Sequence, residues 1–452
     1  MVVQKFGGTS VADPDAIQRL IQIVRTARTR DGRGPAVVVS AMSGVTDTLL
    51  AIAAAGGAGR VDDALSRLEQ LRERHLSAAH ALAPQDAAGD LGTRINAQFD
   101  DLVALAKALS VLREVSPRTL DVVAAAGELL SSRIVAAALT QCGLPAEWVD
   151  ARRAIVTNND HTRAVPLADE TNAALRSSVL ALIDAGRIPV LGGFVGSTVE
   201  GHTTTLGRGG SDYSGALVGA GIGADEIQIW TDVDGMLTAD PRLIAKPRLV
   251  PQLSFAEAAE LAYFGAKVLH PSTILPAVER NIPVRILNAR KPEGSGTMIT
   301  AEPPPGSTPL TALACKRGLT VVDITSSRML MAYGFLRRVF EVFERYRTSV
   351  DVVTTSEVTV SVTVDDRRHL EAIAKALSEF SQVSIEHDMA LLCAVGDRLR
   401  NEPAIAARAV GVFEEVPLRM ISQAASRRNI TVILREADLQ HAMDRLHEEF
   451  FA

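Results

Sequence analysis

Short apolar segments recur through the first 300 residues and alternate with stretches of helical periodicity. The clearest of these segments lie at 2–6, 35–42, 188–195, 226–231 and 284–288. Strands that are apolar on both faces are typical of a parallel sheet with helices on each side. The pattern therefore predicts an α/β fold with a parallel-rich sheet covered on both faces.

Helix signals fill the gaps between these strands. After the strand at 2–6, Asp13 and Pro14 provide an N-cap and a first-turn proline that open a helix. Ile17 and Leu20 begin an apolar stripe at helical spacing. Residues 60–142 are helical in pattern almost throughout, which predicts a helical lobe or a set of crossover helices.

A stiff polar segment marks a domain boundary. Residues 301–307 read Ala-Glu-Pro-Pro-Pro-Gly-Ser, which is typical of a linker, and we place this linker at 301–309. Beyond it the elements are shorter, and a β-α-β-β-α series occurs twice, about 70 residues apart. The repeat predicts two small domains. Neither carries a catalytic cluster, so we expect them to bind a small ligand or a partner.

Composition excludes several classes of partner. Of the 452 residues, 47% are hydrophobic and 22% are charged, and the net charge of −6 argues against nucleic acid binding. We find no apolar stretch long enough to span a bilayer, and the early first strand leaves no room for a signal peptide. Cys142, Cys315 and Cys393 have neither metal-ligand nor disulfide spacing. We therefore expect a cytoplasmic protein with no membrane partner.

A lysine and a glycine pair follow the first strand, in the sequence Lys5-Phe6-Gly7-Gly8-Thr9-Ser10. Glycines let backbone N–H groups approach anionic oxygens closely, a following helix N-terminus favours negative charge, and the lysine adds a full charge. This arrangement suits a phosphate group. A glycine pair alone is also compatible with a simple tight turn.

A second glycine-rich loop surrounds Arg208, in Thr205-Leu206-Gly207-Arg208-Gly209-Gly210-Ser211-Asp212. The guanidinium fork suits a carboxylate or a phosphate, and the glycines open the backbone N–H groups to the same anion. The alternative is a flexible loop with a surface arginine.

Acidic residues follow the strand at 226–231. Asp232 and Asp234 stand where ligands bind in open parallel sheets, and they suit a nucleotide, a metal ion or both. Turn formation is the alternative role. Arg242 and Lys267 are further candidates for phosphate contacts, although Lys267 is equally compatible with a surface position.

Glu128 lies next to Gly127 in an otherwise apolar helix. A buried, unpaired carboxylate is costly, so it suits a cationic partner such as a substrate amine. The competing interpretation is a solvent-facing glutamate.

Taken together, these motifs favour phosphoryl transfer over acyl transfer. Neither His202 nor His270 has an evident serine or cysteine partner. Phosphoryl transfer depends mainly on positioning and charge neutralisation. A carboxylate acceptor is already ionised at neutral pH and needs no general base.

In this order, the motifs resemble those of the aspartate kinases (aspartokinases) over essentially the whole chain. The matching segments are 5–10, 40–46, 127–128, 193–194, 203–212, 231–235 and 264–271. The chain is most similar to the monofunctional, lysine-sensitive type, since no dehydrogenase domain follows. The resemblance implies an amino-acid-kinase catalytic domain at 1–300 and then two ferredoxin-like βαββαβ ACT domains. The first spans 317–387, and the second combines 388–452 with a borrowed strand at 310–316.

The resemblance implies transfer of the ATP γ-phosphoryl group to the β-carboxylate of L-aspartate. The product is 4-phospho-L-aspartate, the first step toward lysine, threonine and methionine. Mg²⁺ is implied to arrive with ATP. The catalytic residues carried over by position are Lys5, Arg208 and Asp212. Those implied for the substrate are Thr46, Glu128, Phe194, Arg208, Gly209, Gly210 and Ser211. Those implied for the nucleotide are Lys5, Gly7, Gly8, Thr231, Asp232, Arg242 and Lys267.

Within that set, three roles follow from the resemblance. Lys5 stabilises the transferring phosphoryl group, Arg208 clamps the α-carboxylate of aspartate, and Glu128 takes its α-amino group. One departure concerns the nucleotide: Leu237 stands where the family often has an aromatic residue, so stacking on the base is lost.

Regulation by lysine is also implied, at the first ACT domain. The matching residues are Met329, Gly334, Val350, Asp351, Thr355, Ser356 and Glu357. Asp351 and Glu357 offer negative charge to a cationic amino acid. The second ACT domain has alanine where a glycine is common, within 420–426. A homodimer or a dimer of dimers through the ACT domains is the implied assembly.

Two other functions remain open from the residues. The chain could phosphorylate another small acidic metabolite on the same fold, although Glu128 with Arg208 favours an α-amino acid. It could also be a non-catalytic amino-acid sensor, although Lys5 and Asp212 are both present. The effector could be lysine, threonine, both or none.

Overall fold

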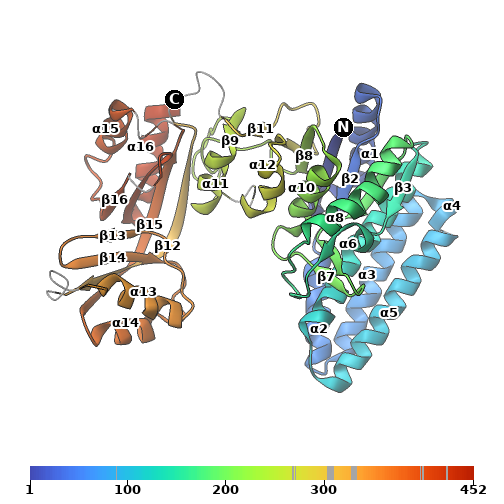
Figure 1. Cartoon of the computed structure of the whole chain (residues 1–452), viewed down its shortest axis with the longest axis horizontal. Helices are drawn as coiled ribbons and strands as arrows, with labels where there is room; N and C mark the ends of the chain where they lie inside the picture. The colour runs from blue at the N-terminus through green and yellow to red at the C-terminus, as the bar shows by residue number, and fades with distance from the viewer. Residues whose placement is uncertain are drawn as a thin grey trace. The chain divides into compact units, whose positions relative to one another are not determined.

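The computed structural model of the protein describes residues 1–87, 89–266, 269, 271–302, 310–326, 333–397, 399, 402–423 and 426–451. The chain divides into two compact units (Figure 1). The first unit comprises 1–236, 251–255 and 268–302, and the second comprises 237–250, 256–267 and 303–452. Two segments of the predicted catalytic range therefore pack with the C-terminal part of the chain. Most of the predicted linker, 303–309, lies outside the described residues.

A mostly parallel sheet forms the centre of the first unit. Its strands, in order across the sheet, are β3 (Ala146–Val149), β5 (Ile188–Gly192), β2 (Ala36–Val39), β1 (Val2–Phe6), β8 (Glu226–Thr231), β10 (Val284–Asn288), β11 (Thr297–Thr300) and β9 (Gln252–Ser254). Neighbouring strands are parallel except β10 and β11. β1, β2 and β5 are buried along their whole length, as expected of strands covered on both faces. The predicted parallel-rich α/β sheet is confirmed.

Helix α1 (Pro14–Asp31) begins at the predicted cap, because the Asp13 carboxylate accepts a hydrogen bond of 2.8 Å from the backbone N–H of Ala16. The glycine pair, however, does not lead directly into this helix. A short 3-10 turn, η1 (Gly8–Val11), comes first. The Asp13 side chain and Pro14 fix the start of the α-helix several residues later.

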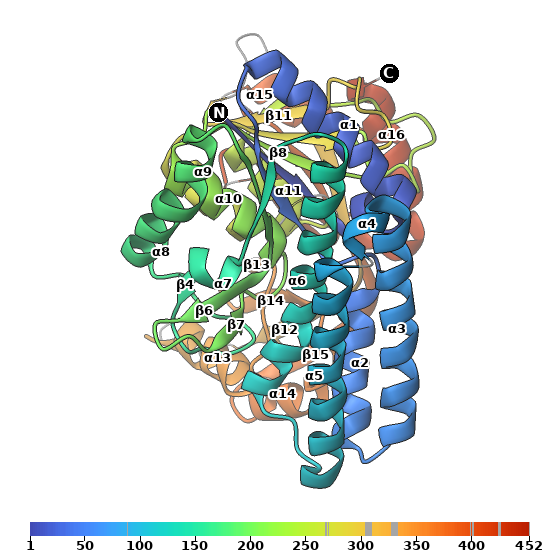
Figure 2. The ribbon, with the colours of Figure 1, turned by 90° about the vertical axis from the view of Figure 1, so that its right-hand side faces the viewer.

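Long helices form a lobe beside the sheet, which includes the predicted range 60–142 and one helix before it. They are α2 (Val45–Gly57), α3 (Val61–Leu82), α5 (Asp90–Leu112) and α6 (Pro117–Gln141). Figure 2 shows α2, α3 and α5 running side by side. Their apolar stripes share one hydrophobic core with α1 and the sheet. The lobe therefore packs as part of the first unit.

Helix α6 corrects one expectation from the sequence. By length and composition it is apolar enough to cross a membrane, although no such stretch was expected from the sequence. Most of its apolar window, 83%, is buried inside the protein. An apolar surface on every side is expected of a helix at the centre of a large core, so burial explains the composition.

A small second sheet lies in the first unit, with β6 (Val195–Thr198) between β4 (Val156–Thr157) and β7 (Thr203–Thr205). The single strand predicted at 188–195 is wrong, since the chain turns after Gly192 and divides it into β5 and β6. Phe194, at the turn, has a φ of +66°. The apolar composition of 188–195 favoured one strand, although the glycine pair at 192–193 is a turn signal.

The second unit is built on one antiparallel sheet (Figure 1). In order across it, the strands are β13 (Val353–Thr355), β14 (Thr359–Val364), β12 (Ala312–Thr325), β15 (Gln382–Val395), β17 (Asn429–Arg435) and β16 (Met420–Ser422). The helices are α13 (Phe335–Arg345), α14 (Leu370–Ser378), α15 (Pro403–Gly411) and α16 (Leu439–Phe451). The repeated small α/β units expected after the linker are present.

Two strands run through both halves of this sheet. The first part of β12, 312–316, pairs with 391–395 of β15, and its second part, 319–325, pairs with 382–389. A register shift near Gly318 separates the two parts. Each half nevertheless has its own core, with α13 and α14 in one and α15 and α16 in the other. Two ACT-like units therefore share a continuous ladder of hydrogen bonds.

Candidate active site

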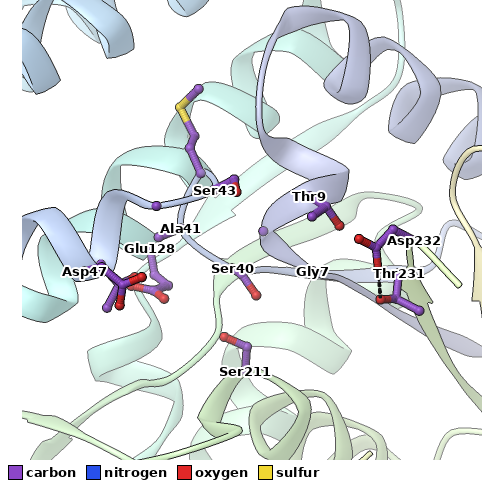
Figure 3. Close-up of a pocket in the computed structure, with 14 residues that line it drawn as sticks. Gly7, Thr9, Ser40, Ala41, Ser43, Asp47, Glu128, Ser211, Thr231 and Asp232 are labelled. Atoms are coloured by element: carbon purple, nitrogen blue, oxygen red, sulfur yellow. Dashed lines mark hydrogen bonds between the residues drawn. The ribbon is translucent and has the colours of Figure 1, made fainter. Parts of the chain in front are cut away.

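A pocket of about 420 Å³ opens at the carboxyl ends of β1, β2 and β8. It is lined by Gly7, Gly8, Thr9, Ser40, Ala41, Met42, Ser43, Gly44, Thr46, Asp47, Glu128, Ser211, Thr231 and Asp232. In Figure 3, Asp47 and Glu128 lie together at one end, Thr231 and Asp232 lie at the other, and Ser40 and Ser211 lie between them. Ligands bind at such strand ends in open parallel sheets. Seven of the predicted site residues are among the lining.

Lys5 and Asp212 form a buried ion pair beside this pocket. The Lys5 ammonium lies 2.7 Å from Oδ1 of Asp212, and only 9% and 18% of the two side chains are exposed. A Cβ added to Gly7 would lie 3.6 Å from the same ammonium, so the lysine is directed toward the glycine turn. The pair therefore holds a cation beside the glycine turn, and Asp212 fixes its position.

Glu128 is buried, with 4% of its surface exposed, and it lines the pocket. Burial raises the pKa of Glu128 to about 8, although a backbone hydrogen bond with Ala41 and the charge of Lys5 oppose this shift. Its Oε2 has no hydrogen-bond partner within the part of the chain that the structure describes. The solvent-facing alternative is wrong. An unsatisfied buried oxygen in a pocket is suited to a cationic donor on a ligand.

Gly127 explains how Glu128 reaches the pocket. A Cβ at this position would lie 2.8 Å from Cβ of Ala41 and 3.2 Å from Cγ1 of Val45. Only glycine therefore lets α6 approach the segment between β2 and α2 closely. The adjacent carboxylate is placed against the pocket wall as a result.

The β5–β6 turn packs against the start of α10 (Gly210–Ile222). A Cβ on Gly193 would lie 2.8 Å from Cα of Ser211, so the contact requires a glycine. Phe194 donates its N–H to Oγ of Ser214 at 2.8 Å and accepts a bond from the N–H of Leu206 at 3.0 Å. These bonds hold a non-glycine residue at positive φ, which costs about 1–3 kcal/mol. Strain of this kind is often found at functional sites.

Arg208 lies exposed on the loop between β7 and α10. Its side chain has no ion pair or hydrogen bond with any residue that the structure describes. Gly207 and Gly209, on either side, have φ of +75° and +71°. Arg208, Gly209 and Gly210 directly precede Ser211 in the chain, and Phe194 donates its N–H to the carbonyl of Gly210. None of these four residues lines the pocket itself. The guanidinium is free to meet an anion.

The strand-end acids have different surroundings. Asp232 is exposed at the pocket, where it accepts a hydrogen bond of 3.3 Å from Thr231. Asp234 is instead bonded to Lys291 at 2.8 Å and Asn288 at 2.5 Å, and these donors lower its pKa. Asp234 therefore has the turn-forming role, while Asp232 remains open to a ligand.

The remaining nucleotide candidates are not in this pocket. Arg242 belongs to the second unit, where it forms a two-pronged pair with Asp240, at 3.0 and 2.6 Å. Lys267 lies outside the described residues. Conversely, Asp47 lines the pocket beside Glu128 and was not a candidate. Its position in the first turn of α2, just after the glycine at 44, is the signal that could have found it.

The candidate effector residues lie in the second unit. Asp351 is half-buried, and both its oxygens accept 3.0 Å hydrogen bonds from the ammonium of Lys316, which also lies 2.7 Å from Asp365. Burial raises the pKa of Asp351, and Lys316 opposes that shift. Gly334 caps α13 at φ +82°. Val350 is half-buried, whereas Thr355, Ser356 and Glu357 are exposed; Met329 lies outside the described residues.

Comparison with known proteins agrees with this geometry. Residues 1–288 match the model of the amino acid kinase family, and 392–450 match an ACT domain. Lysine-sensitive aspartokinase 3 of Escherichia coli is 34% identical, over 100% of this chain and 99% of its own. Aspartokinase 3, chloroplastic, of Arabidopsis thaliana is 36% identical over 99% of this chain and 81% of its own.

Two solved structures of E. coli aspartokinase III are similar to this chain, and each match covers 100% of this chain and 100% of the other. The R-state complex with aspartate and ADP has a TM-score of 0.82 at 33% identity, and the T-state complex with lysine and aspartate has 0.83 at 34%. The fold and site thus define an amino acid kinase with ACT domains. Within that class, the chain belongs to the aspartokinases.

Proposed function

We propose that this aspartokinase phosphorylates the β-carboxylate of L-aspartate with ATP in the pocket at the ends of β1, β2 and β8. The observation that carries the proposal is Glu128. Its buried oxygen without a partner lies in the same pocket as the glycine turn beside Lys5. An acid suited to an amine therefore lines the cavity, and a cation suited to a phosphoryl group lies beside its glycine turn.

The amino-acid end of the site is proposed to recognise both groups at the α-carbon. Glu128 accepts from the α-ammonium, and Arg208 pairs with the α-carboxylate in a two-pronged geometry. Thr46 and Ser211 border the β-carboxylate, and Phe194 with Gly209 and Gly210 shape the loop around it. The E. coli enzyme whose structure contains aspartate supports this choice of substrate.

The phosphoryl end of the site is proposed to act by charge. Lys5 neutralises the oxygens of the transferring group, the backbone at Gly7 and Gly8 allows close approach, and Asp212 orients the lysine. Because the acceptor carboxylate is already ionised, no general base is needed. Stabilisation of the developing charge by preorganised donors then supplies most of the rate enhancement.

The nucleotide is proposed to extend toward Thr231 and Asp232, while Arg242 and Lys267 stay candidates for phosphate contacts from the sequence alone. The described residues contain no group of three or more metal-ligating side chains. This fits Mg²⁺, which is commonly held by substrate phosphates, waters and one or two carboxylates. Asp232, exposed at the pocket, would supply such a carboxylate. Bound Mg²⁺ would neutralise phosphate charge.

Regulation is proposed to occur through lysine at the first ACT unit, around Asp351 and Glu357. The lysine-sensitive relative and its complex with lysine support this choice of effector over threonine. Met329, Gly334, Val350, Thr355 and Ser356 complete the proposed effector site. We further propose a cytoplasmic homodimer or dimer of dimers that assembles through the ACT units.

The test is ATP-dependent formation of aspartyl phosphate, trapped with hydroxylamine as the hydroxamate, with and without lysine. Wild type should form the product, and Lys5→Met should lower kcat by at least about 100-fold, as expected on losing a donor to the transition state. Lys107→Met, on the exposed surface of α5, is the matched control and should be fully active. Folded wild-type protein that gives no hydroxamate with Mg-ATP would refute the proposal.

A further inference from the structure

We propose that Asp121 is a positioning residue for aspartate recognition, because it joins the helix that carries Glu128 to the loop that carries Arg208. The inference rests on the proposed function and identifies what holds its substrate site in place. Asp121 does not line the pocket. Its contribution is therefore indirect, through the two elements that it connects.

Asp121 is a completely buried carboxylate, with 0% of its surface exposed. It accepts bonds from Nδ1 of His161 at 2.6 Å, from the N–H of Thr162 at 3.0 and 3.1 Å, and from Oγ1 of Thr205 at 2.5 Å. Burying an unpaired carboxylate is very costly, so a site like this persists only when its donors are fixed in place. The donors come from two chain segments distant from α6.

The first connection runs along α6. Asp121 and Glu128 are seven residues apart, which is close to two turns, so both side chains project from the same face of the helix. Any change in how α6 is anchored at Asp121 therefore moves the carboxylate of Glu128 as well.

The second connection runs to the Arg208 loop. Thr205 ends β7, only three residues before Arg208. Thr162, held at φ +72°, has its carbonyl oxygen 3.3 Å from where a Cβ on Gly207 would lie. The N–H of Ala164 also bonds to the carbonyl of Thr205, at 2.9 Å. The cluster thus supports the start of this loop from two sides.

Arg208 itself has no partner that could orient it in the described structure. Its direction is therefore set by the loop ends, one of which Asp121 fixes. Loss of this anchor should weaken contact with the α-carboxylate of aspartate. Among the described residues, the strand end at Thr231 and Asp232 has no hydrogen bond to the cluster, so the affinity for ATP should be unchanged.

Asp121→Asn and Thr205→Val test the proposal, with Thr204→Val as the matched control. Thr204 is also buried on β7, but its hydroxyl bonds to Thr157 at 2.7 Å and not to Asp121. Both test variants should raise KM for aspartate by about tenfold, the value of one or two buried hydrogen bonds. KM for ATP should stay within about twofold, and the control should match wild type.

Limited trypsin digestion gives a second readout that does not depend on activity. Cleavage after Arg208, followed by mass spectrometry, should be faster in both test variants and unchanged in the control. Unaltered KM and cleavage would overturn the proposal. So would a uniform loss of kcat and both affinities together with a lower Tm, which indicates a general structural role. If wild type lacks kinase activity, the proposed function fails, and the digestion still decides whether Asp121 holds the loop.

Discussion

At the scale of single residues, burial of Glu128 favours the protonated carboxyl, whereas its proposed role requires the ionised carboxylate. Its pKa of about 8 means that the empty site holds this carboxyl mostly protonated at neutral pH. An ammonium group needs the ionised form. If Glu128 takes the α-ammonium as proposed, aspartate binding below pH 8 releases a proton.

We predict that KM for aspartate falls by about fivefold from pH 7 to pH 8, as the ionised fraction of Glu128 rises. Steady-state kinetics over this range, with KM for ATP measured in parallel, check the prediction. Glu128→Gln should show a higher KM with little pH dependence. A wild-type KM for aspartate that is flat across this range would count against the assigned role.

The same residue should cost the unliganded protein stability. Its pKa is raised from 4.5 in the unfolded chain to about 8, so stability is lost as pH rises between these values. Glu128→Gln removes this loss, by up to a few kcal/mol. The Tm of the variant minus that of wild type should therefore be larger at pH 8 than at pH 5. An equal difference at both pH values would show that Glu128 does not titrate in this range.

At the scale of elements, the close packing of α6 determines where Glu128 lies in the pocket. Gly127→Val would bring a side chain against Ala41 and Val45, which lie within 3.2 Å of the added Cβ. We predict a loss of about 1–3 kcal/mol of stability, as for overpacking, together with a lower kcat/KM for aspartate.

Chemical denaturation and steady-state kinetics on the same preparation measure both effects. Gly411→Ala is the control: Gly411 ends α15 with open space around its Cβ position. This substitution should be neutral or stabilising in a helix. If Gly127→Val behaves like the control, neither stability nor kcat/KM for aspartate depends on the close approach of α6.

The elements also show what a sequence can and cannot predict. Asp13 with Pro14 predicted the start of α1, since capping is a local interaction. The turn at Phe194 was not predicted, although Gly192 and Gly193 give a local turn signal within the apolar run. Its positive φ is stabilised by Ser214 and Leu206, which are distant in the chain.

The same distinction holds for the site. Glu128 was identifiable as a charge in an apolar helix. The cluster around Asp121 was not, because it joins residues 40 to 84 positions apart whose meeting depends on tertiary packing. Likewise, the pairing of Lys5 with Asp212 requires the register of β1 against α10, which no local pattern encodes.

At the scale of the whole molecule, Lys316 bears on regulation. Its ammonium donates hydrogen bonds to both carboxylate oxygens of Asp351, the residue to which a cationic effector is proposed to bind. An effector must therefore displace an internal cation. The strength of inhibition should depend on how firmly Lys316 is held.

We predict that Lys316→Met lowers the lysine concentration for half-inhibition by about fivefold, the value of a partly exposed ion pair. Asp351→Ala should abolish inhibition, and kcat without lysine should be unchanged in both. Inhibition curves by the hydroxamate assay measure this. Arg337→Met, which removes an exposed pair with Glu341, is the control and should leave the curve unaltered. Identical curves for wild type, Lys316→Met and Asp351→Ala would remove the effector from this site.

The strands β12 and β15 each pass through both halves of the second unit's sheet. Any single cut in the chain between residues 312 and 395 either divides one of these two strands or leaves one half of the sheet without a paired strand. In evolutionary terms, recombination can exchange the two halves only together. The pair is thus one heritable module, although each half retains a core of its own.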